Sequence, residues 1–314
     1  MRAAALAVLL ACGGARAAWF HGDSPGAEAT RQLFENKRYD QLIADLTADG
    51  RLERLRGADL RSAYLYLGLA YEKIGRADRA VGVYQLGVSL FPKDVNLLTQ
   101  LAQTLHDGGL EEQAEPIFQR ILKIHPNNAA AHLGLGEIDL KLGFYDRGAD
   151  HFEKALKQLG DNGEVWREYG ELFLASNRPQ QAEPALLRSI SLKDTVDARA
   201  DLAAAQRAEG HLDEALKTLT AAVTAHPERL DVLSARSLWL LEAGREDEAL
   251  ADAEKLLAGS EPPPLAYWVR ARVRLRRDQY GAAVEDLKAL TLQERLAPFA
   301  AAAARQLLKQ LGAR

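Results

Sequence analysis

The sequence predicts an all-α protein in which antiparallel helix pairs stack into an α-solenoid. Three observations predict this fold. The chain repeats itself seven times at a spacing of about 34 residues. Each copy carries two apolar stripes at helical spacing, and a glycine or a proline follows most stripes. One copy cannot bury enough apolar surface to fold alone, so neighbouring copies must stack into a continuous core.

The clearest copy runs from Arg61 to Asp94. Its first helix is predicted to end at Gly75, because glycine readily adopts the left-handed backbone that stops a helix. Its second helix is predicted to end before Pro92, whose ring cannot continue a helix. The apolar stripe of the first helix consists of Tyr64, Leu67, Gly68 and Tyr71, and that of the second consists of Ala80, Tyr84 and Gly87.

Six further copies keep the same offsets. They begin at Val95, Ala129, Gly163, Val196, Leu230 and Pro264. Small residues recur at one offset of the first helix, where they let the paired helices approach closely. These are Gly68, Ala102, Gly136, Gly170 and Ala203. Glycine also recurs at the turn between the helices, at Gly75, Gly109, Gly143, Gly210 and Gly244.

These residues resemble the tetratricopeptide repeat family, and the resemblance extends over roughly Arg61 to Ala297. It implies a right-handed superhelix in which the first helix of each pair lines a concave groove. It also implies a protein-binding function rather than a particular reaction. We expect a degenerate repeat and connector at 18–57, seven repeats at 58–297, and a capping helix at 298–314.

Two arginines occupy core-facing offsets in the last two repeats. Arg236 and Arg270 stand where the other repeats have leucine or tyrosine. Sixteen positions later, these two repeats alone have an aspartate, Asp252 and Asp286 respectively. Because a buried unpaired cation is costly, we predict an ion pair across each of these two helix pairs.

The N-terminus reads as a secretory signal peptide at residues 1–17, with a short apolar run too brief to span a bilayer. Ala15-Arg16-Ala17 suits cleavage that would release a soluble, periplasmic protein. Alternatively, Leu9-Leu10-Ala11-Cys12 resembles a bacterial lipobox, in which Cys12 would be lipidated and would anchor the chain to the outer membrane. A cytoplasmic protein with a misleading start is the third interpretation. Cys12 is the chain's one cysteine, so no internal disulfide can form.

Composition and motifs exclude several function classes. The net charge of -4 argues against general nucleic-acid binding, which depends on many Lys and Arg contacts to phosphates. The sequence has no phosphate-binding glycine loop, no zinc-protease motif and no cysteine pair. His132 and His151 lie at core or near-core offsets, and we interpret them as structural rather than as metal ligands. We therefore expect no enzyme activity, no cofactor and no small-molecule substrate.

The predicted binding groove lies at first-helix offsets that point away from the paired helix. Amide side chains there suit an extended peptide backbone, because an amide both donates and accepts hydrogen bonds. A groove-facing tryptophan can also anchor a partner. Some family members that bind chaperones clamp a carboxylate with Lys and Asn at two groove offsets. This chain has Leu65 and Leu69 there, so we do not expect that clamp. The groove residues are Leu65, Leu69, Asn96, Thr99, Gln103, His106, Glu137, Arg167, Glu171, Arg207, Trp268 and Arg272.

Together these features predict a non-enzymatic interaction scaffold of the bacterial cell envelope, which binds protein or peptide segments. One alternative is an outer-membrane lipoprotein that helps to assemble a secretin, pilus or polysaccharide-export complex. Another is the regulatory subunit of an envelope enzyme. Contact with a membrane is expected only if Cys12 is lipidated.

Overall fold

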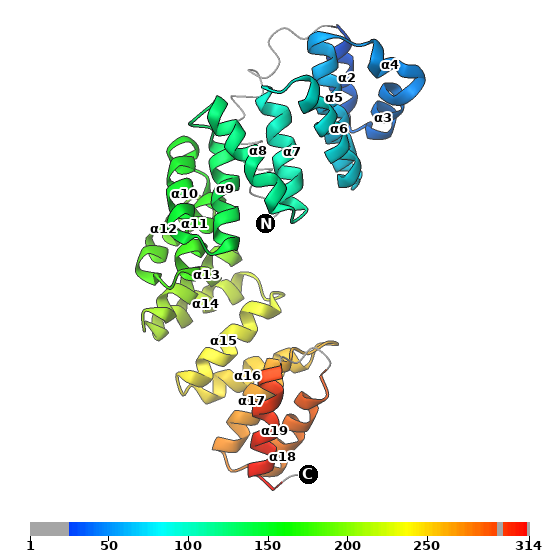
Figure 1. Ribbon diagram of the computed structural model, residues 1–314. Helices are drawn as coiled ribbons and strands as arrows, with labels where there is room; N and C mark the ends of the chain where they lie inside the picture. The colour runs from blue at the N-terminus through cyan, green and yellow to red at the C-terminus, as the bar shows by residue number, and fades with distance from the viewer. Residues whose placement is uncertain (1–24, 294–297, 313–314) are drawn as a thin grey trace. The chain divides into compact units, whose positions relative to one another are not determined.

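The computed structural model describes residues 25–293 and 298–312, and all regular elements in these ranges are helices. Successive helices pair and stack along the chain (Figure 1), which confirms the predicted all-α solenoid. The predicted signal peptide and Cys12 lie outside the described residues. No helix in the described ranges has the length and hydrophobicity needed to cross a membrane.

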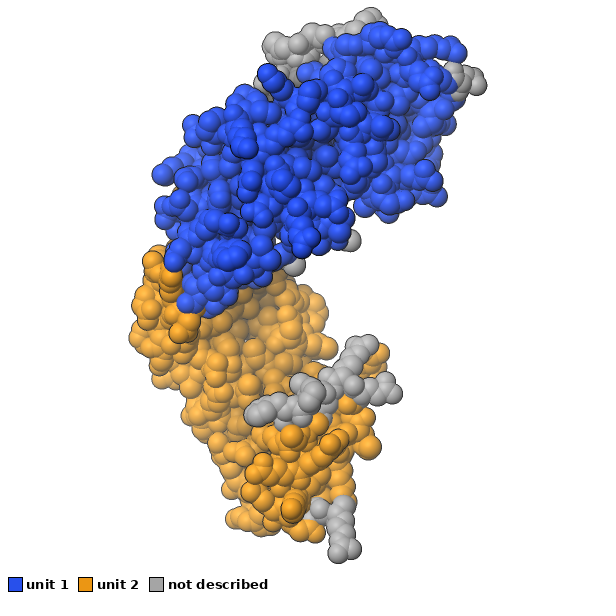
Figure 2. Space-filling view, viewed as in Figure 1, with its two compact units in different colours: residues 1–176 blue, residues 177–314 orange. Residues whose placement is uncertain are grey.

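The chain forms two compact units, residues 1–176 and 177–314, coloured separately in Figure 2. The N-terminal unit begins with α2 (Pro25–Glu35), α3 (Tyr39–Thr47) and the one-turn α4 (Arg51–Arg54). Leu42 and Leu46 of α3 pack in one apolar cluster with Leu67 of the next helix, so this short pair covers the first full repeat. The sequence predicted a connector where α4 lies, because four residues are too few to show a helical period.

Three complete helix pairs and one further first helix follow in the N-terminal unit. Its first helices are α5 (Gly57–Lys73), α7 (Val95–Asp107), α9 (Ala129–Leu142) and α11 (Gly163–Ala175). Its second helices are α6 (Ala77–Leu90), α8 (Glu111–Ile124) and α10 (Tyr145–Leu159). A polar residue fixes the start of most first helices: Asp94, Asn128 and Asn162 each accept a hydrogen bond from a backbone N–H of the first turn.

The turns between paired helices have the predicted left-handed backbone. Gly75 and Gly143 each have a φ of 78°. Where the glycine is missing, Asn177 and Asp278 occupy the same offset with φ of 57° and 58°. Asn and Asp are the side chains that tolerate this region best, so the turn geometry is kept in these two repeats as well.

The small-residue offset is explained by contact with the second helix. A methyl group added at Gly68 would overlap the ring of Tyr84, which is completely buried. At Gly136 an added Cβ would lie 3.1 Å from the ring of Phe152, also completely buried. Because an aromatic side chain of α6 or α10 fills this space, a larger residue in the first helix would force the pair apart.

The C-terminal unit continues the same alternation of first and second helices. Its members are α12 (Pro179–Leu192), α13 (Val196–Ala208), α14 (Leu212–Ala225), α15 (Leu230–Glu242), α16 (Glu246–Leu257), α17 (Pro264–Arg276), α18 (Tyr280–Thr291) and α19 (Pro298–Gln310). Ala304, Leu307 and Leu308 of α19 pack against Leu287 and Leu290 of α18 in one apolar cluster. The last helix therefore covers apolar side chains of the final pair.

Both predicted ion pairs are confirmed. Arg236 Nη2 lies 2.6 Å from Asp252 Oδ1, and Arg270 Nη2 lies 2.7 Å from Asp286 Oδ1. The Asp252 and Asp286 side chains are 9% and 3% exposed, so each arginine neutralises a nearly buried carboxylate. Arg274 adds a second cation to Asp286 at 2.8 Å. The sequence did not indicate this third partner, because Arg274 lies at a different offset from Arg270.

Candidate functional site

Polar side chains connect neighbouring first helices of the N-terminal unit, where α5, α7, α9 and α11 lie next to one another. We call this set the inner row. It comprises Glu72 of α5, Thr104 and His106 of α7, Glu137 of α9 and Glu168 of α11. Polar groups at this depth are costly unless they are hydrogen-bonded or neutralised, so their pairing indicates what the surface can bind.

The first link joins α5 to α7. Thr104 Oγ1 lies 2.5 Å from Glu72 Oε1 and 2.7 Å from the backbone oxygen of Gln100. One hydroxyl proton can serve only one of these two acceptors. Burial raises the pKa of the Glu72 carboxyl, although the Thr104 hydroxyl opposes the shift. A protonated Glu72 resolves the contact, because it can donate to Thr104 while Thr104 donates to Gln100.

His106 is the centre of the second link. Its Nδ1 lies 2.5 Å from Glu111 Oε2, and its Nε2 lies 2.9 Å from Glu137 Oε2. Lys141 Nζ contacts the other Glu111 oxygen at 2.6 Å. Burial opposes a charged imidazole, but hydrogen bonds to Glu137 and Glu111 raise the pKa of His106. An imidazolium donates from both ring nitrogens, so the charged ring satisfies both carboxylates.

The third link is a pair of carboxyls, Glu137 and Glu168. Burial, together with the nearby charges of Glu137 and Glu164, raises the pKa of the Glu168 carboxyl well above its usual range. Glu168 is only 5% exposed, and its Oε2 has no hydrogen-bond partner. Two carboxyls this close cannot both ionise at low cost. Glu168 is therefore the carboxyl of this pair that favours its protonated form.

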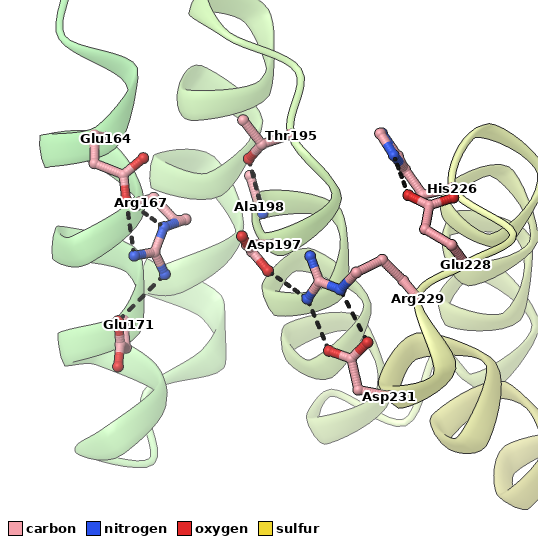
Figure 3. A network of polar contacts seen from close by, with 10 residues as sticks. All are labelled: Glu164, Arg167, Glu171, Thr195, Asp197, Ala198, His226, Glu228, Arg229 and Asp231. Atoms are coloured by element: carbon pink, nitrogen blue, oxygen red, sulfur yellow. Dashed lines mark hydrogen bonds and ion pairs between the residues drawn. The ribbon is translucent and has the colours of Figure 1, made fainter. Parts of the chain in front are cut away.

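Arg167 holds two further acids on α11 (Figure 3). Its Nη2 lies 2.9 Å from Glu164 Oε1, and its Nη1 lies 3.4 Å from Glu171 Oε2. The guanidinium side chain is 13% exposed, whereas that of Glu171 is 50% exposed. This arrangement supplies a cation beside the Glu137–Glu168 pair, but that cation already has two carboxylate partners.

The structure places the other predicted groove residues of this unit at different depths. Leu65 and Thr99 are each 6% exposed, and Leu65 belongs to the core cluster between α5 and α7. Leu69 is partly buried against the same cluster. Asn96 and Gln103 are partly exposed, and the Gln103 amide donates to Asp107 at 3.0 Å. The two amides thus remain accessible, while Leu65 and Thr99 contribute to packing.

Ion pairs link the first helices of the C-terminal unit. Arg207 of α13 binds Glu242 of α15 at 2.9 Å and lies 5.1 Å from the centre of the Trp239 ring. Arg229 lies 2.7 Å from both Asp197 and Asp231 (Figure 3). Arg207, predicted from the sequence to face a partner, is therefore held by side chains of its own chain.

Arg272 differs from the other arginines of α17. Arg270 and Arg274 share Asp286, and Arg276 and Arg277 contact Glu246. The guanidinium of Arg272 lies 5.7 Å from the centre of the Trp268 ring. Trp268 also packs against the cluster that α19 covers, so its ring is partly buried.

The two core histidines bind each other. Nδ1 of His132 lies 2.9 Å from Nδ1 of His151, and Nε2 of His132 lies 2.9 Å from the backbone oxygen of Pro126. Because a carbonyl only accepts, His132 is protonated at Nε2 and accepts at Nδ1 from His151. Burial lowers the pKa of both rings, and the neighbouring His132 lowers that of His151 further. Two neutral rings satisfy every one of these contacts.

Sequence reasoning missed Glu168 of the inner row, and it missed the contact of Glu111 on α8 with His106. Glu168 lies one position beyond the groove offset of Arg167, at an offset occupied in earlier repeats by Tyr66, Gln100 and Gly134. An acid at an offset that holds uncharged residues in the three earlier repeats was the available signal. Glu111 was interpreted as a favourable charge at a helix start, and its link to His106 depends on tertiary contact.

Comparisons of the sequence and of the structure with known proteins both give the tetratricopeptide repeat. Sequence models of the tetratricopeptide repeat match residues 61–104, 138–195 and 200–266. A crystal structure of a tetratricopeptide repeat protein from Parabacteroides merdae has a TM-score of 0.58 and 18% identity. The match covers 80% of this chain and 98% of that one.

Curated relatives also match at the sequence level. The Vi polysaccharide export protein VexE of Salmonella typhi is 28% identical over 215 residues, which are 67% of this chain and 30% of the relative. The peroxisomal targeting signal receptor of Candida albicans is 26% identical over 182 residues, which are 55% of this chain and 31% of the relative. The chain spans between 13% and 31% of the length of the curated relatives that it matches.

The buried histidines should titrate on opposite sides of the ordinary imidazole pKa of about 6.5. The carboxylates around His106 place its midpoint above that value, whereas burial places those of His132 and His151 below it. His106 therefore stabilises the fold fully below the unfolded pKa, and this contribution is lost as pH rises through its folded pKa. The His132–His151 pair is destabilised as pH falls below the unfolded pKa.

NMR titration of the imidazole carbon-bound protons checks this prediction. Variants His106→Gln, His132→Gln and His151→Gln assign the signals. A His106 midpoint below the ordinary imidazole pKa would contradict the charged state assigned to it.

Proposed function

Because the chain belongs to the tetratricopeptide repeat family, we propose that it binds segments of other proteins along the inner row of its N-terminal unit. The observation that carries this proposal is a difference between two sets of offsets. Groove offsets change residue type from repeat to repeat, whereas offsets between paired helices stay small or apolar in most repeats. One groove offset holds Glu72 in the first repeat and His106 in the second, and another holds Leu69, Gln103 and Glu137 in the first three repeats. Packing within a pair does not require such variety, whereas recognition of a particular partner does.

Two accessible amides flank this row. Asn96 and Gln103 lie on α7, and their side chains are partly exposed. Each can donate to a peptide carbonyl and accept from a peptide N–H. We propose that they hold the backbone of an extended segment, while the acids beside them select its side chains. The function is that of a non-enzymatic scaffold, consistent with a fold whose relatives include a receptor for a targeting signal.

We further propose that the scaffold works in the bacterial cell envelope. The apolar run and small residues of 1–17 support export, and Cys12 offers a lipid attachment point. A relative named as a polysaccharide export protein supports assistance to an export complex. Regulation of an envelope enzyme is a role that the same surface could serve.

Capture of partners from envelope extract tests the binding surface. The double variant Asn96→Ala/Gln103→Ala should lose at least one protein that the wild-type chain captures, because two backbone hydrogen-bonding groups are removed. Gln85→Ala/Gln113→Ala is the matched control, since these amides are exposed on the second helices α6 and α8. The proposed surface would be wrong if wild type, variant and control captured the same proteins in equal amounts.

Metabolic labelling with palmitate tests the form of export. If Cys12 is lipidated, the wild-type chain incorporates label and enters the membrane fraction, and Cys12→Ala abolishes both. Export as a soluble protein predicts no label in either chain and a mature N-terminus at Ala18. A chain that keeps Met1 and stays in the cytoplasmic fraction would contradict both forms.

A further inference from the structure

We propose that the Glu137–Glu168 carboxyl pair is a subsite for a cationic side chain, the lysine or arginine of a partner segment bound along the inner row. This inference rests on the proposed function and adds the chemistry of the partner: a basic segment of another protein.

Charge around the pair favours a cation. The acidic side chains of this cluster are Glu111, Glu137, Glu164, Glu168 and Glu171, and the cationic ones are His106, Lys141 and Arg167. Each cationic side chain already contacts at least one carboxylate other than Glu168. The cluster therefore has more acids than its own cations neutralise, and the deficit falls on the Glu137–Glu168 pair.

Glu168 supplies the observation that points to a ligand. Its side chain is 5% exposed, yet its buried Oε2 has no hydrogen-bond partner. Buried polar atoms are normally satisfied, and an exception requires an explanation. An ammonium or guanidinium group carries several donors and a positive charge. Such a group would satisfy this oxygen and would allow both carboxyls to ionise.

The pair can be reached from one side. Glu137 is more accessible than Glu168, with 15% of its side chain exposed. An incoming cation would contact Glu137 first and then draw the Glu168 carboxylate towards it. Arg236 and Asp252 of the C-terminal unit form a contact of this kind within the chain. The Arg236 guanidinium donates two short hydrogen bonds to the Asp252 carboxylate. In the N-terminal unit the partner segment would provide the cation.

The occupant that suits this subsite is an organic cation rather than a metal ion. Within the described residues, no group of three or more His, Cys, Asp and Glu side chains is placed to hold a metal. His106 is engaged through both ring nitrogens, one of them by Glu137 itself, so the ring is not available as a metal ligand. A paired carboxylate with directional hydrogen-bond acceptors suits lysine or arginine.

Binding of a cation must expel the proton that the empty pair holds. The charged groups that face Glu168 are Glu137 from α9 and Glu164 and Arg167 from its own helix, and His106 of α7 acts through Glu137. Burial and the two glutamates raise the pKa of Glu168, so a bound cation releases a proton below that pKa. Loss of charge from His106 at higher pH leaves Glu137 less neutralised. Both effects strengthen binding of a cation as pH rises.

Fluorescence anisotropy with defined peptides tests the subsite. The probes are ten-residue peptides of Gly, Ser and Ala that carry two lysines, two glutamines or two glutamates. At low salt, where charge pairs are least screened, the wild-type chain should bind the lysine peptide about tenfold more tightly than the glutamine peptide, a difference of about 1.4 kcal/mol. The glutamate peptide should bind no better than the glutamine peptide.

The variant Glu168→Gln should remove most of this preference. Glutamine keeps the shape of the side chain and can donate to Glu137 as a protonated Glu168 does, so the fold is retained. Glu137→Gln is the second test of the pair. Glu112→Gln is the matched control, because Glu112 is exposed on α8, and it should keep the preference to within about twofold.

Calorimetry in two buffers of different ionisation enthalpy measures the proton release. Wild type should release close to one proton per lysine peptide below the pKa of Glu168, and Glu168→Gln should release none. The subsite is refuted if the lysine peptide shows no preference, or if Glu168→Gln and Glu137→Gln bind it as wild type does. If extract partners are then still captured through Asn96 and Gln103, the scaffold function stands and only the basic-segment inference fails.

Discussion

The close approach of the first and second helix of each pair is the packing constraint on which the rest of the structure depends. At Gly68 and Gly136 the first helix has no side chain, and an aromatic ring of the second helix fills the space. Contact at this distance fixes which face of each first helix is turned to its partner. It also fixes which face is left to meet the neighbouring repeats, and the apolar clusters extend from pair to pair through those contacts.

The same constraint explains why the inner row could diverge. Offsets that face the paired helix cannot change without a compensating change, as Arg236 with Asp252 and Arg270 with Asp286 demonstrate. Offsets that face the adjacent first helix carry different polar groups in successive repeats. There the chain has placed Glu72 against Thr104, and His106 between two glutamates. In the C-terminal unit, first helices are linked by arginine–carboxylate pairs such as Arg207 with Glu242.

Contacts within one repeat could be predicted from the sequence better than contacts between repeats. The helix pairs, the turn positions and the two ion pairs were predictable because they lie at fixed offsets within one repeat. Asn177 and Asp278 occupy the same turn offset in the two repeats that lack the glycine. The inner row was only partly predictable. His106 and Glu137 were named as groove residues, but their contact with each other joins different repeats.

Contacts between repeats depend on the exact rotation of one helix against the next, which a period alone does not determine. Glu168 was therefore missed, although its offset carries uncharged residues in the earlier repeats. Leu65 and Thr99 were placed in the groove by offset, yet each is only 6% exposed. Burial at such positions follows from the size of side chains on the adjacent repeat, and only the folded chain reveals it.

Equilibrium unfolding in urea of Gly68→Ala and Gly82→Ala measures the packing constraint directly. Both glycines lie inside helices, so alanine at either site gains about 1 kcal/mol of helix propensity. An added methyl at Gly82 meets open space, whereas at Gly68 it overlaps the buried Tyr84 ring. We expect Gly82→Ala to raise the free energy of unfolding by up to about 1 kcal/mol, and Gly68→Ala to lower it by about 2 kcal/mol. A Gly68→Ala chain as stable as wild type, with unchanged cooperativity, would contradict the requirement for close approach.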